Sequence, residues 1–551
     1  MTLFWTGNTK SPEAELSAGI GNNNNSNTLD SQHFPSGVVI VDAIVPDSSS
    51  DGWEGKVPLK ITTGQESLTD SSEGTEITMS APRKLDKYGF ILNIDANGLV
   101  YESKTNSHVA AAAAASGVTS HPDVHRNEQR ERKWNYTLNN WERRRSKKLK
   151  ERLRKGVPDA VRGKVWLALG GGIRVPGLYQ QIVQKTSDAM LSSYKELACK
   201  NNPEAVVALD THENDSIPTT TVPASSEEHS PKAKTAREIL SDSEKETSPS
   251  TEEYARSPAF RAVQDTIERD IHRTFPRHNL FYEEDNQRAD DAVAIAASSL
   301  LGISGTCDPE LASLIVNLDR DIKAINVSGG TTTPLSTSSS SLNGNSKFAT
   351  PNGQAALRRV LRAYSYYDRE VSYCQGMNFI AGMFLTVMSE EEAFWLLVSV
   401  MHDKPCEMRG MFGEGMRETH KVLYVAEGLI HMHLPRVARH FDKENIHVTM
   451  YATQWLLTQF TSSFKFDLVT RVWDAFLGEG WKIIYRVMLA LLQQWQSQLL
   501  RMSFEDILTF FRELPERVNG NSIMETALRI NLKTRQIVKL EKEFYDKEQR
   551  K

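Results

Sequence analysis

Apolar residues along this chain are distributed unevenly, and long polar stretches separate segments that have helical spacing. Residues 1–80 are rich in Ser, Asn, Asp, Gly and Thr, with a single short apolar segment, Val38 to Val45. We expect this region to be disordered because it has too little apolar surface to bury. A helical pattern begins near Glu128, where Trp134, Leu138 and Trp141 recur at intervals of four and three residues. That spacing places the three side chains on one face of a helix.

The rest of the chain is predicted to be one helical domain, spanning 126–548, with two polar inserts. Residues 81–125 precede it: 83–101 has the pattern of a strand or short hairpin that docks onto a neighbour, followed by a low-complexity alanine run. The inserts are 201–258, dense in Ser, Thr, Glu and Pro, and 284–353, which is rich in Ser and Thr. The second contains an apolar piece, 292–325, that is compatible with a helix. After Gln354 the pattern is helical almost to the end.

Composition and charge restrict the class of protein. The chain has 551 residues, 39% hydrophobic and 25% charged, with a net charge of −5. So weak a net charge argues against attraction of the whole protein to nucleic acid. The four cysteines have no short spacing, which favours a reducing compartment without disulfides. We find no signal-peptide pattern, and the most apolar run, Ile483 to Leu492, is too short to span a bilayer. We therefore expect a cytoplasmic protein.

A first candidate for chemistry is an arginine at the end of an amphipathic segment. Val263, Ile267, Ile271 and Phe275 are spaced by four residues, and Pro276 then stops the helix. On another face Asp270 and Arg273 are three residues apart, so the carboxylate can hold the guanidinium in place. An ordinary surface ion pair is the alternative interpretation.

A second candidate is a glutamine at a loop–helix junction. A helix that includes Leu357 to Tyr364 is predicted to end near Asp368, and a new helix to begin at Met377, directly after Gln375-Gly376. The glutamine amide can face outward there, although a capping role is the alternative. A slow GTPase needs a cation for the charge that develops on the phosphoryl group and an amide that orients the attacking water. Together the arginine and the glutamine suggest a protein that completes the active site of another protein.

Several motifs in order resemble the TBC family, whose members act as Rab GTPase-activating proteins. The resemblance covers about 130–548, apart from the two inserts. Its motifs are the opening Gly156-Val-Pro158 with Arg162 and Trp166; the arginine-finger motif Ile267, Asp270, Arg273 and Thr274; the glutamine-finger motif Tyr373, Gln375 and Gly376; and the later blocks His433-Leu-Pro435, His440-Phe441, Gln454-Trp455, Phe466-Asp467 and Arg471-Val-Trp-Asp474.

The resemblance implies an all-α fold in two lobes and a mechanism that acts in trans. Arg273 would approach the phosphates of GTP bound to a partner Rab, and Gln375 would orient the water in place of the Rab's own glutamine. Asp270 would support the arginine, while Thr274, Tyr373 and Gly376 complete the two motifs. The remaining motif residues would be mainly structural: Gly156, Pro158, Arg162, Trp166, Trp473 and Asp474. No cofactor is implied, because the magnesium and GTP arrive with the partner.

Two departures from the family pattern bear on this expectation. Ser372 stands before Tyr373 where the family usually has glycine, so the turn could be tighter or shifted. The insert 284–353 lies between the two finger motifs and could cover the Rab-binding face. Three Ser-Pro pairs, at Ser230, Ser248 and Ser257, lie in the first insert, and phosphorylation there would add charge close to the arginine segment.

Other features of the sequence bear on functions other than GTPase activation. The basic stretch 126–155 is interpreted as a solvated helix face rather than a nucleic-acid site, although attraction to anionic membrane, and so recruitment to endomembranes, is compatible with it. His431 and His433 are two apart and do not share a helix face, so no metal site is expected. A non-catalytic recruiter that binds a GTPase through the same groove remains the main alternative.

Overall fold

The structure is a computed structural model that describes residues 85–92, 121–141, 147–201, 251–282, Ala297, 309–327 and 353–550. Within these ranges the regular elements are helices, and β structure is limited to two isolated antiparallel bridges. The predicted all-α fold class is therefore confirmed for this part of the chain. The polar segments 1–80 and 202–250, together with Ser230 and Ser248, lie outside the described residues.

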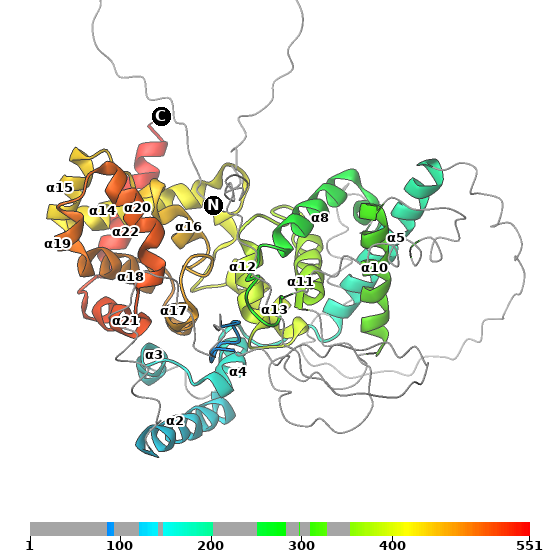
Figure 1. Ribbon diagram of the computed structural model, residues 1–551, viewed down its shortest axis with the longest axis horizontal. Helices are drawn as coiled ribbons and strands as arrows, with labels where there is room; N and C mark the ends of the chain where they lie inside the picture. Colours follow the sequence, from blue (N-terminus) through cyan, green and yellow to red (C-terminus); the bar gives the residue numbers. More distant parts are fainter. Residues whose placement is uncertain are drawn as a thin grey trace, which may run out of the picture.

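The helices form two lobes that lie side by side in Figure 1, and one continuous apolar core runs through both. Three helices, α2 (His121–Asn139), α3 (Lys147–Arg154) and α4 (Asp159–Leu169), lie below the two lobes in Figure 1. The first lobe contains α5 (Leu178–Asn201), α7 (Thr251–Arg256), α8 (Pro258–Ile271), α10 (Pro309–Val327), α11 (Gly353–Tyr367), α12 (Met377–Leu385) and α13 (Glu390–His402). The second contains α14 (Arg417–His433), α15 (Pro435–Lys443), α16 (Ala452–Leu457), α17 (Phe466–Glu479), α18 (Trp481–Gln494), α19 (Gln496–Leu499), α20 (Phe504–Arg517), α21 (Gly520–Arg529) and α22 (Thr534–Glu548). Short 3-10 turns occur at Arg409–Met411, Glu414–Met416 and Val448–Met450.

The helix α2 begins at His121, earlier than the pattern indicated, since a proline in the first turn is compatible with helix geometry. Trp134 and Leu138 of α2, together with Trp141 just beyond its end, pack on a small separate core formed with α3 and α4. Trp134 is buried there. The tryptophans of the basic stretch therefore serve packing within this core.

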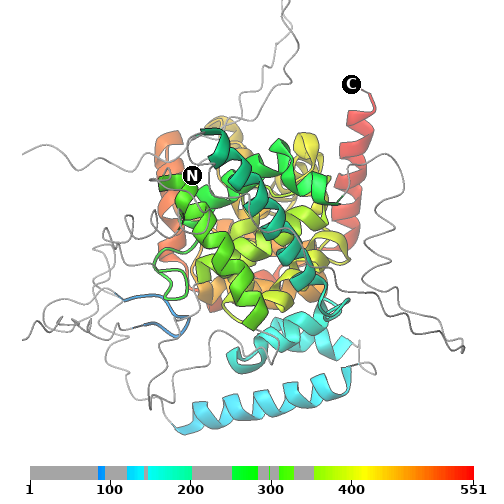
Figure 2. The ribbon, with the colours of Figure 1, turned by 90° about the vertical axis from the view of Figure 1, so that its right-hand side faces the viewer.

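The helix α10 lies within the expected insert 284–353 and confirms that its apolar piece is helical between 309 and 327. It packs along α5 and against α11, as Figure 2 shows for α5 and α10. Its buried Asp321 pairs with Arg359 (2.7 Å) and Arg362 (2.9 Å) of α11. Arg359 also pairs with Glu390 at 2.6 Å. This part of the insert is thus an integral layer of the first lobe.

Residues 85–92, within the segment predicted to form a strand or short hairpin, form a tight turn closed by one antiparallel bridge. Leu85 bridges Ile91, and Phe90 bridges His278 in the loop that follows α8. The predicted docking onto a neighbour is confirmed for these residues, while 93–101 lie outside the described part of the chain. The first expected insert is likewise partly helical, because α7 occupies 251–256 and Ser257 caps α8 by accepting a hydrogen bond from the backbone of Phe260 at 3.1 Å.

Candidate functional site

The helix α8 presents Arg273 just beyond its C-terminus. The stripe predicted for this segment is inside the core, since Ile267 and Ile271 are fully buried and Phe275 is nearly so. The helix ends at Ile271, and Pro276 prevents its continuation. The Arg273 side chain is 28% exposed to solvent. A cation is therefore held at the protein surface by a helix whose apolar face is buried.

Gln375 lies in the loop between α11 and α12, directly before the N-cap of α12. Gly376 adopts φ 108°, a conformation that side chains with a Cβ rarely take. Ser372 adopts φ 58°, in the left-handed region, and its N–H donates to the carbonyl of Asp368 at 2.7 Å. The serine therefore takes a backbone conformation that favours glycine, at a cost in backbone strain.

The structure brings the two predicted finger residues into direct contact. The side-chain oxygen of Gln375 accepts hydrogen bonds from the guanidinium of Arg273, from Nη1 at 2.8 Å and from Nη2. This orientation of the amide follows from the donors around it, because the opposite one would turn its NH₂ toward the guanidinium. Two residues that are 102 positions apart in the sequence thus share one site.

Asp270 connects both segments. Its carboxylate pairs with Nη2 of Arg273 at 2.5 Å and accepts a hydrogen bond from the Tyr373 hydroxyl. Burial, and then the neighbouring Asp270 carboxylate, raise the pKa of Tyr373 well above its ordinary value, so the phenol remains a donor. Burial also raises the pKa of the intervening Cys374 to about 11, which keeps that thiol neutral beside the site.

A second connection runs through Asn378, which the sequence analysis did not single out. Its amide donates to the Thr274 hydroxyl at 2.8 Å and to the Asp270 carbonyl at 3.4 Å, and its oxygen accepts from the Gly376 N–H at 3.0 Å. Thr274 itself donates to the Asp270 carbonyl at 2.7 Å. The sequence feature that points to Asn378 is a polar residue at the start of an otherwise apolar helix. Asn378 is fully buried, and a buried asparagine requires hydrogen-bond partners.

Asp368 anchors the loop that carries Gln375. Its carboxylate accepts two hydrogen bonds from Arg409, both at 2.7 Å, and one from the Val371 N–H at 3.3 Å. Burial alone would raise the pKa of Asp368, but hydrogen bonds from His402 and Arg409 outweigh it and hold that pKa below its usual range. The carboxylate therefore stays charged, and it fixes the start of the loop to the turn at Arg409–Met411.

The opening motif lies apart from the finger pair and joins the two lobes. Asp474 of α17 accepts from the Val157 N–H (2.7 Å), the Trp166 indole (2.8 Å) and Arg162 Nε (3.3 Å). Trp166 also packs against Trp473, with ring centroids 6.3 Å apart. These contacts agree with a structural role.

The two remaining residues of the opening motif shape the chain entering α4. Gly156 has φ 88°, and a Cβ there would lie 2.7 Å from Nε of Arg471. Pro158 is the N-cap residue of α4. Both therefore allow the opening motif to lie close against α17.

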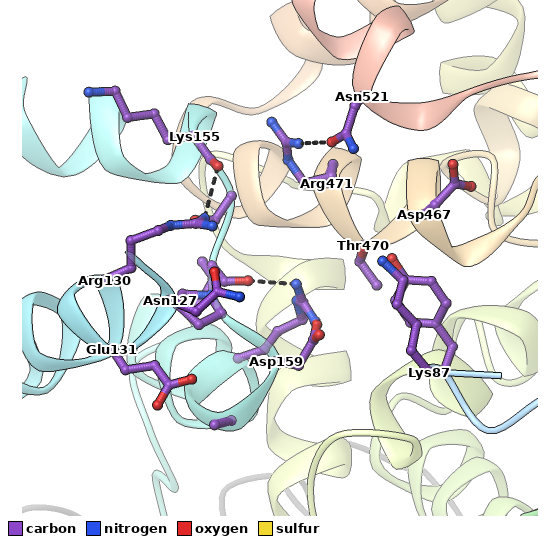
Figure 3. Close-up of a pocket in the computed structure, with 16 residues that line it drawn as sticks. Lys87, Asn127, Arg130, Glu131, Lys155, Asp159, Asp467, Thr470, Arg471 and Asn521 are labelled. Atoms are coloured by element: carbon purple, nitrogen blue, oxygen red, sulfur yellow. Dashed lines mark hydrogen bonds and ion pairs between the residues drawn. The ribbon is translucent and has the colours of Figure 1, made fainter. Parts of the chain in front are cut away.

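A cavity of about 500 Å³ lies beside this junction (Figure 3). Two of its basic side chains, Arg130 and Arg471, make hydrogen bonds to other groups of the protein. Arg130 donates to the carbonyl oxygens of Lys155 (3.1 Å) and Gly156 (2.9 Å), and Arg471 donates to Asn521 at 2.5 Å. Arg273 and Gln375 do not line this cavity.

Among the described residues, no group of three or more His, Cys, Asp and Glu side chains is arranged to hold a metal ion. In the same part of the chain, the helices are too short or too polar to cross a bilayer.

Comparison with known proteins shows what part of the chain resembles. Residues 321–500 match the family model of the Rab-GTPase-TBC domain. This part of the chain therefore resembles the TBC family, the family that the motifs predicted. The match includes Gln375 and begins in α10, so Arg273 precedes it.

Curated relatives match a part of the chain. The human ecotropic viral integration site 5 protein homolog is 39% identical over 195 residues, which is 35% of this chain and 24% of the relative. The Rab GTPase-activating protein eat-17 of Caenorhabditis elegans is 36% identical over 198 residues, 35% of this chain and 22% of the relative. The chain thus matches about a quarter of the length of these relatives. The crystal structure of the Chlamydomonas flagellar RabGAP TBC domain aligns with a TM-score of 0.42 and 21% identity, covering 81% of this chain and all of that one.

Proposed function

We propose that this protein accelerates GTP hydrolysis by a Rab-type small GTPase, to which it supplies Arg273 and Gln375 in trans. The observation that supports the proposal most strongly is the direct hydrogen bonding between the two side chains. An arginine that stabilises the charge on the transferred phosphoryl and an amide that orients the attacking water must both lie beside the same phosphoryl group. Side chains already in contact at a protein surface meet that requirement.

The anchors of the pair suit such a role. Asp270 restricts the guanidinium while leaving it partly exposed, and Asn378 ties the arginine segment to the start of α12. On engagement, phosphate oxygens would replace the Gln375 oxygen as acceptors for Arg273. An arginine finger supplied in trans contributes roughly 10³- to 10⁵-fold in rate, or about 4 to 7 kcal/mol of barrier.

Nucleotide and magnesium would belong to the partner, and the protein alone would not hydrolyse GTP. Its glycine clusters at 170–172 and at Gly413 and Gly415 lack the lysine of a phosphate-binding loop. The partner would be a GTP-bound Rab at an endomembrane. The basic surface of α3, where Lys148 and Lys150 are exposed, would favour anionic lipid there.

The test is single-turnover GTP hydrolysis by a panel of GTP-loaded Rabs. Wild type, Arg273→Ala and Gln375→Ala are added separately, and the binding of each to the same Rabs is measured. We expect acceleration of one or a few Rabs by wild type and loss of that acceleration in both variants. Binding of a GTP-loaded Rab without acceleration would instead support the recruiter.

A further inference from the structure

The turn at residues 85–92 is built by its own sequence. The Asp86 carboxylate accepts from the backbone N–H groups of Tyr88 (2.8 Å) and Phe90 (2.9 Å), and the Asp86 N–H donates to the Phe90 carbonyl at 2.9 Å. Gly89 provides φ 94° between them. An aspartate that bonds to the following backbone is a recognised way to form a turn without a surrounding sheet.

This turn is hydrogen-bonded to the loop that follows Arg273. The Ile91 N–H donates to the Arg277 carbonyl at 2.8 Å, and the Asn279 N–H donates to the Gly89 carbonyl at 2.9 Å. The buried His278 contributes a third bond, to the Tyr88 carbonyl at 2.7 Å. Since its other ring nitrogen accepts from the Leu280 N–H at 3.1 Å, the nitrogen facing Tyr88 carries the proton.

Aromatic packing extends the contact toward the fingers. The Phe90 ring meets His278 and Phe466 edge-on at centroid distances of 4.9 and 4.8 Å, and it meets Phe275 at 6.3 Å. Phe275 comes two residues after Arg273 and adopts φ 48°, which is unusual for a large side chain. A conformation of this kind persists only when neighbouring groups hold it.

Phe275 also contacts the helix that begins beside Gln375. Its ring packs on Phe379 of α12 at 5.7 Å. A Cβ added to Gly382 would lie 2.9 Å from the Thr274 side chain and 3.2 Å from that of Phe275. Phe275 therefore lies between the turn at 85–92 and α12, on the segment that carries the arginine.

We propose that the turn at 85–92 is a positioning element for Arg273, with Phe90 as its principal residue. By closing over Phe275 and His278, the turn holds the loop at 274–279 in the conformation that keeps Arg273 against Gln375. This proposal rests on the proposed function and adds a part of the chain outside the residues that match the family model.

The experiment compares four full-length proteins: wild type, Phe90→Ala, Gly89→Ala and Leu85→Ala. Gly89→Ala disturbs the turn by a second route, because the new Cβ would lie 2.9 Å from Nε2 of His278 at a positive φ. Leu85 is 39% exposed in the same turn and is the matched control. Single-turnover hydrolysis by the responsive Rab is measured against activator concentration, which separates maximal rate from affinity. Hydrogen exchange reports on the amide of Asn279.

We expect Phe90→Ala and Gly89→Ala to lower the maximal rate about tenfold, equal to about 1.4 kcal/mol, with little change in half-saturating concentration. Exchange at Asn279 should quicken in both, and Leu85→Ala should match wild type. Faster exchange at Asn279 with an unchanged maximal rate of GTP hydrolysis would overturn the positioning role. Unchanged exchange at Asn279 in both variants would overturn the docking of the turn on the loop at 274–279. If wild type accelerates no Rab, the proposed function fails and the positioning role with it, while exchange still reports whether the turn holds the loop.

Discussion

Replacing Asp270 with alanine should both destabilise the protein and uncouple Arg273 from its site. The carboxylate is nearly buried and accepts from Arg273 and from the buried Tyr373 hydroxyl. The change leaves that hydroxyl without its acceptor, which costs about 1–3 kcal/mol. The ion pair adds at most about 1 kcal/mol, because Arg273 is 28% exposed and screened by solvent. We expect a loss of about 1–4 kcal/mol in the free energy of unfolding, measured by urea titration.

The effect on rate follows from the position of the guanidinium. Of the two partners described for Arg273, Asp270 and Gln375, only Gln375 remains in this variant. We therefore expect roughly a 10- to 100-fold loss in the single-turnover rate of GTP hydrolysis at saturating activator. Part of the finger's contribution should remain, since a full finger supplies about 10³ to 10⁵. Binding to the GTP-loaded Rab should change little.

A double-mutant cycle separates positioning from general damage. If Asp270 acts through Arg273, Asp270→Ala should have almost no further effect on rate in an Arg273→Ala background. Tyr373→Phe is the matched control, because it removes one hydroxyl and leaves the carboxylate on the arginine. An Asp270→Ala protein that is folded and as fast as wild type would refute the reasoning. An equal loss of rate in both backgrounds would do the same.

Three further changes test other parts of the structure. Gly376→Ala forces a Cβ into a positive-φ conformation and should cost about 1–3 kcal/mol in unfolding free energy while displacing Gln375 and slowing hydrolysis. Asp321→Ala leaves two buried arginines short of a counter-charge and should cost about 3–5 kcal/mol, seen as an earlier urea midpoint. Because the pKa of Asp368 lies below that of an unfolded aspartate, about 3.9, its stabilisation is complete at neutral pH and is lost as pH falls below that value. The stability gap between wild type and Asp368→Asn should therefore be constant above about pH 5 and shrink in acid, and a gap independent of pH would contradict this.

Local patterns were sufficient to predict much of the finger site. The four-residue spacing from Val263 to Phe275 predicted the buried face of α8, and the i,i+3 relation of Asp270 and Arg273 predicted their ion pair, which the structure contains. Gly382 of α12 lies against Thr274 and Phe275, a close approach that its small size permits. These features depend on periodicity and residue size, which a sequence displays directly.

Contacts between distant segments were not predictable in the same way. Asp321 appeared as one acidic residue in a polar insert, and nothing local indicated that it pairs with arginines 38 and 41 positions away. The docking of Phe90 on Phe275 likewise joins segments that become neighbours only in the folded chain. Loop closure over such distances depends on the whole core, so pattern analysis of either segment alone cannot find the partner.

The most direct test of the central claim uses a Rab that has lost its own water-orienting glutamine. GTP hydrolysis by that variant is followed in single turnover with wild type, Arg273→Ala or Gln375→Ala added at saturating concentration. If this protein supplies both groups, wild type should still accelerate the Rab variant, and neither finger variant should do so. Acceleration by wild type that disappears with the Rab glutamine, or that survives in Gln375→Ala, would contradict the account.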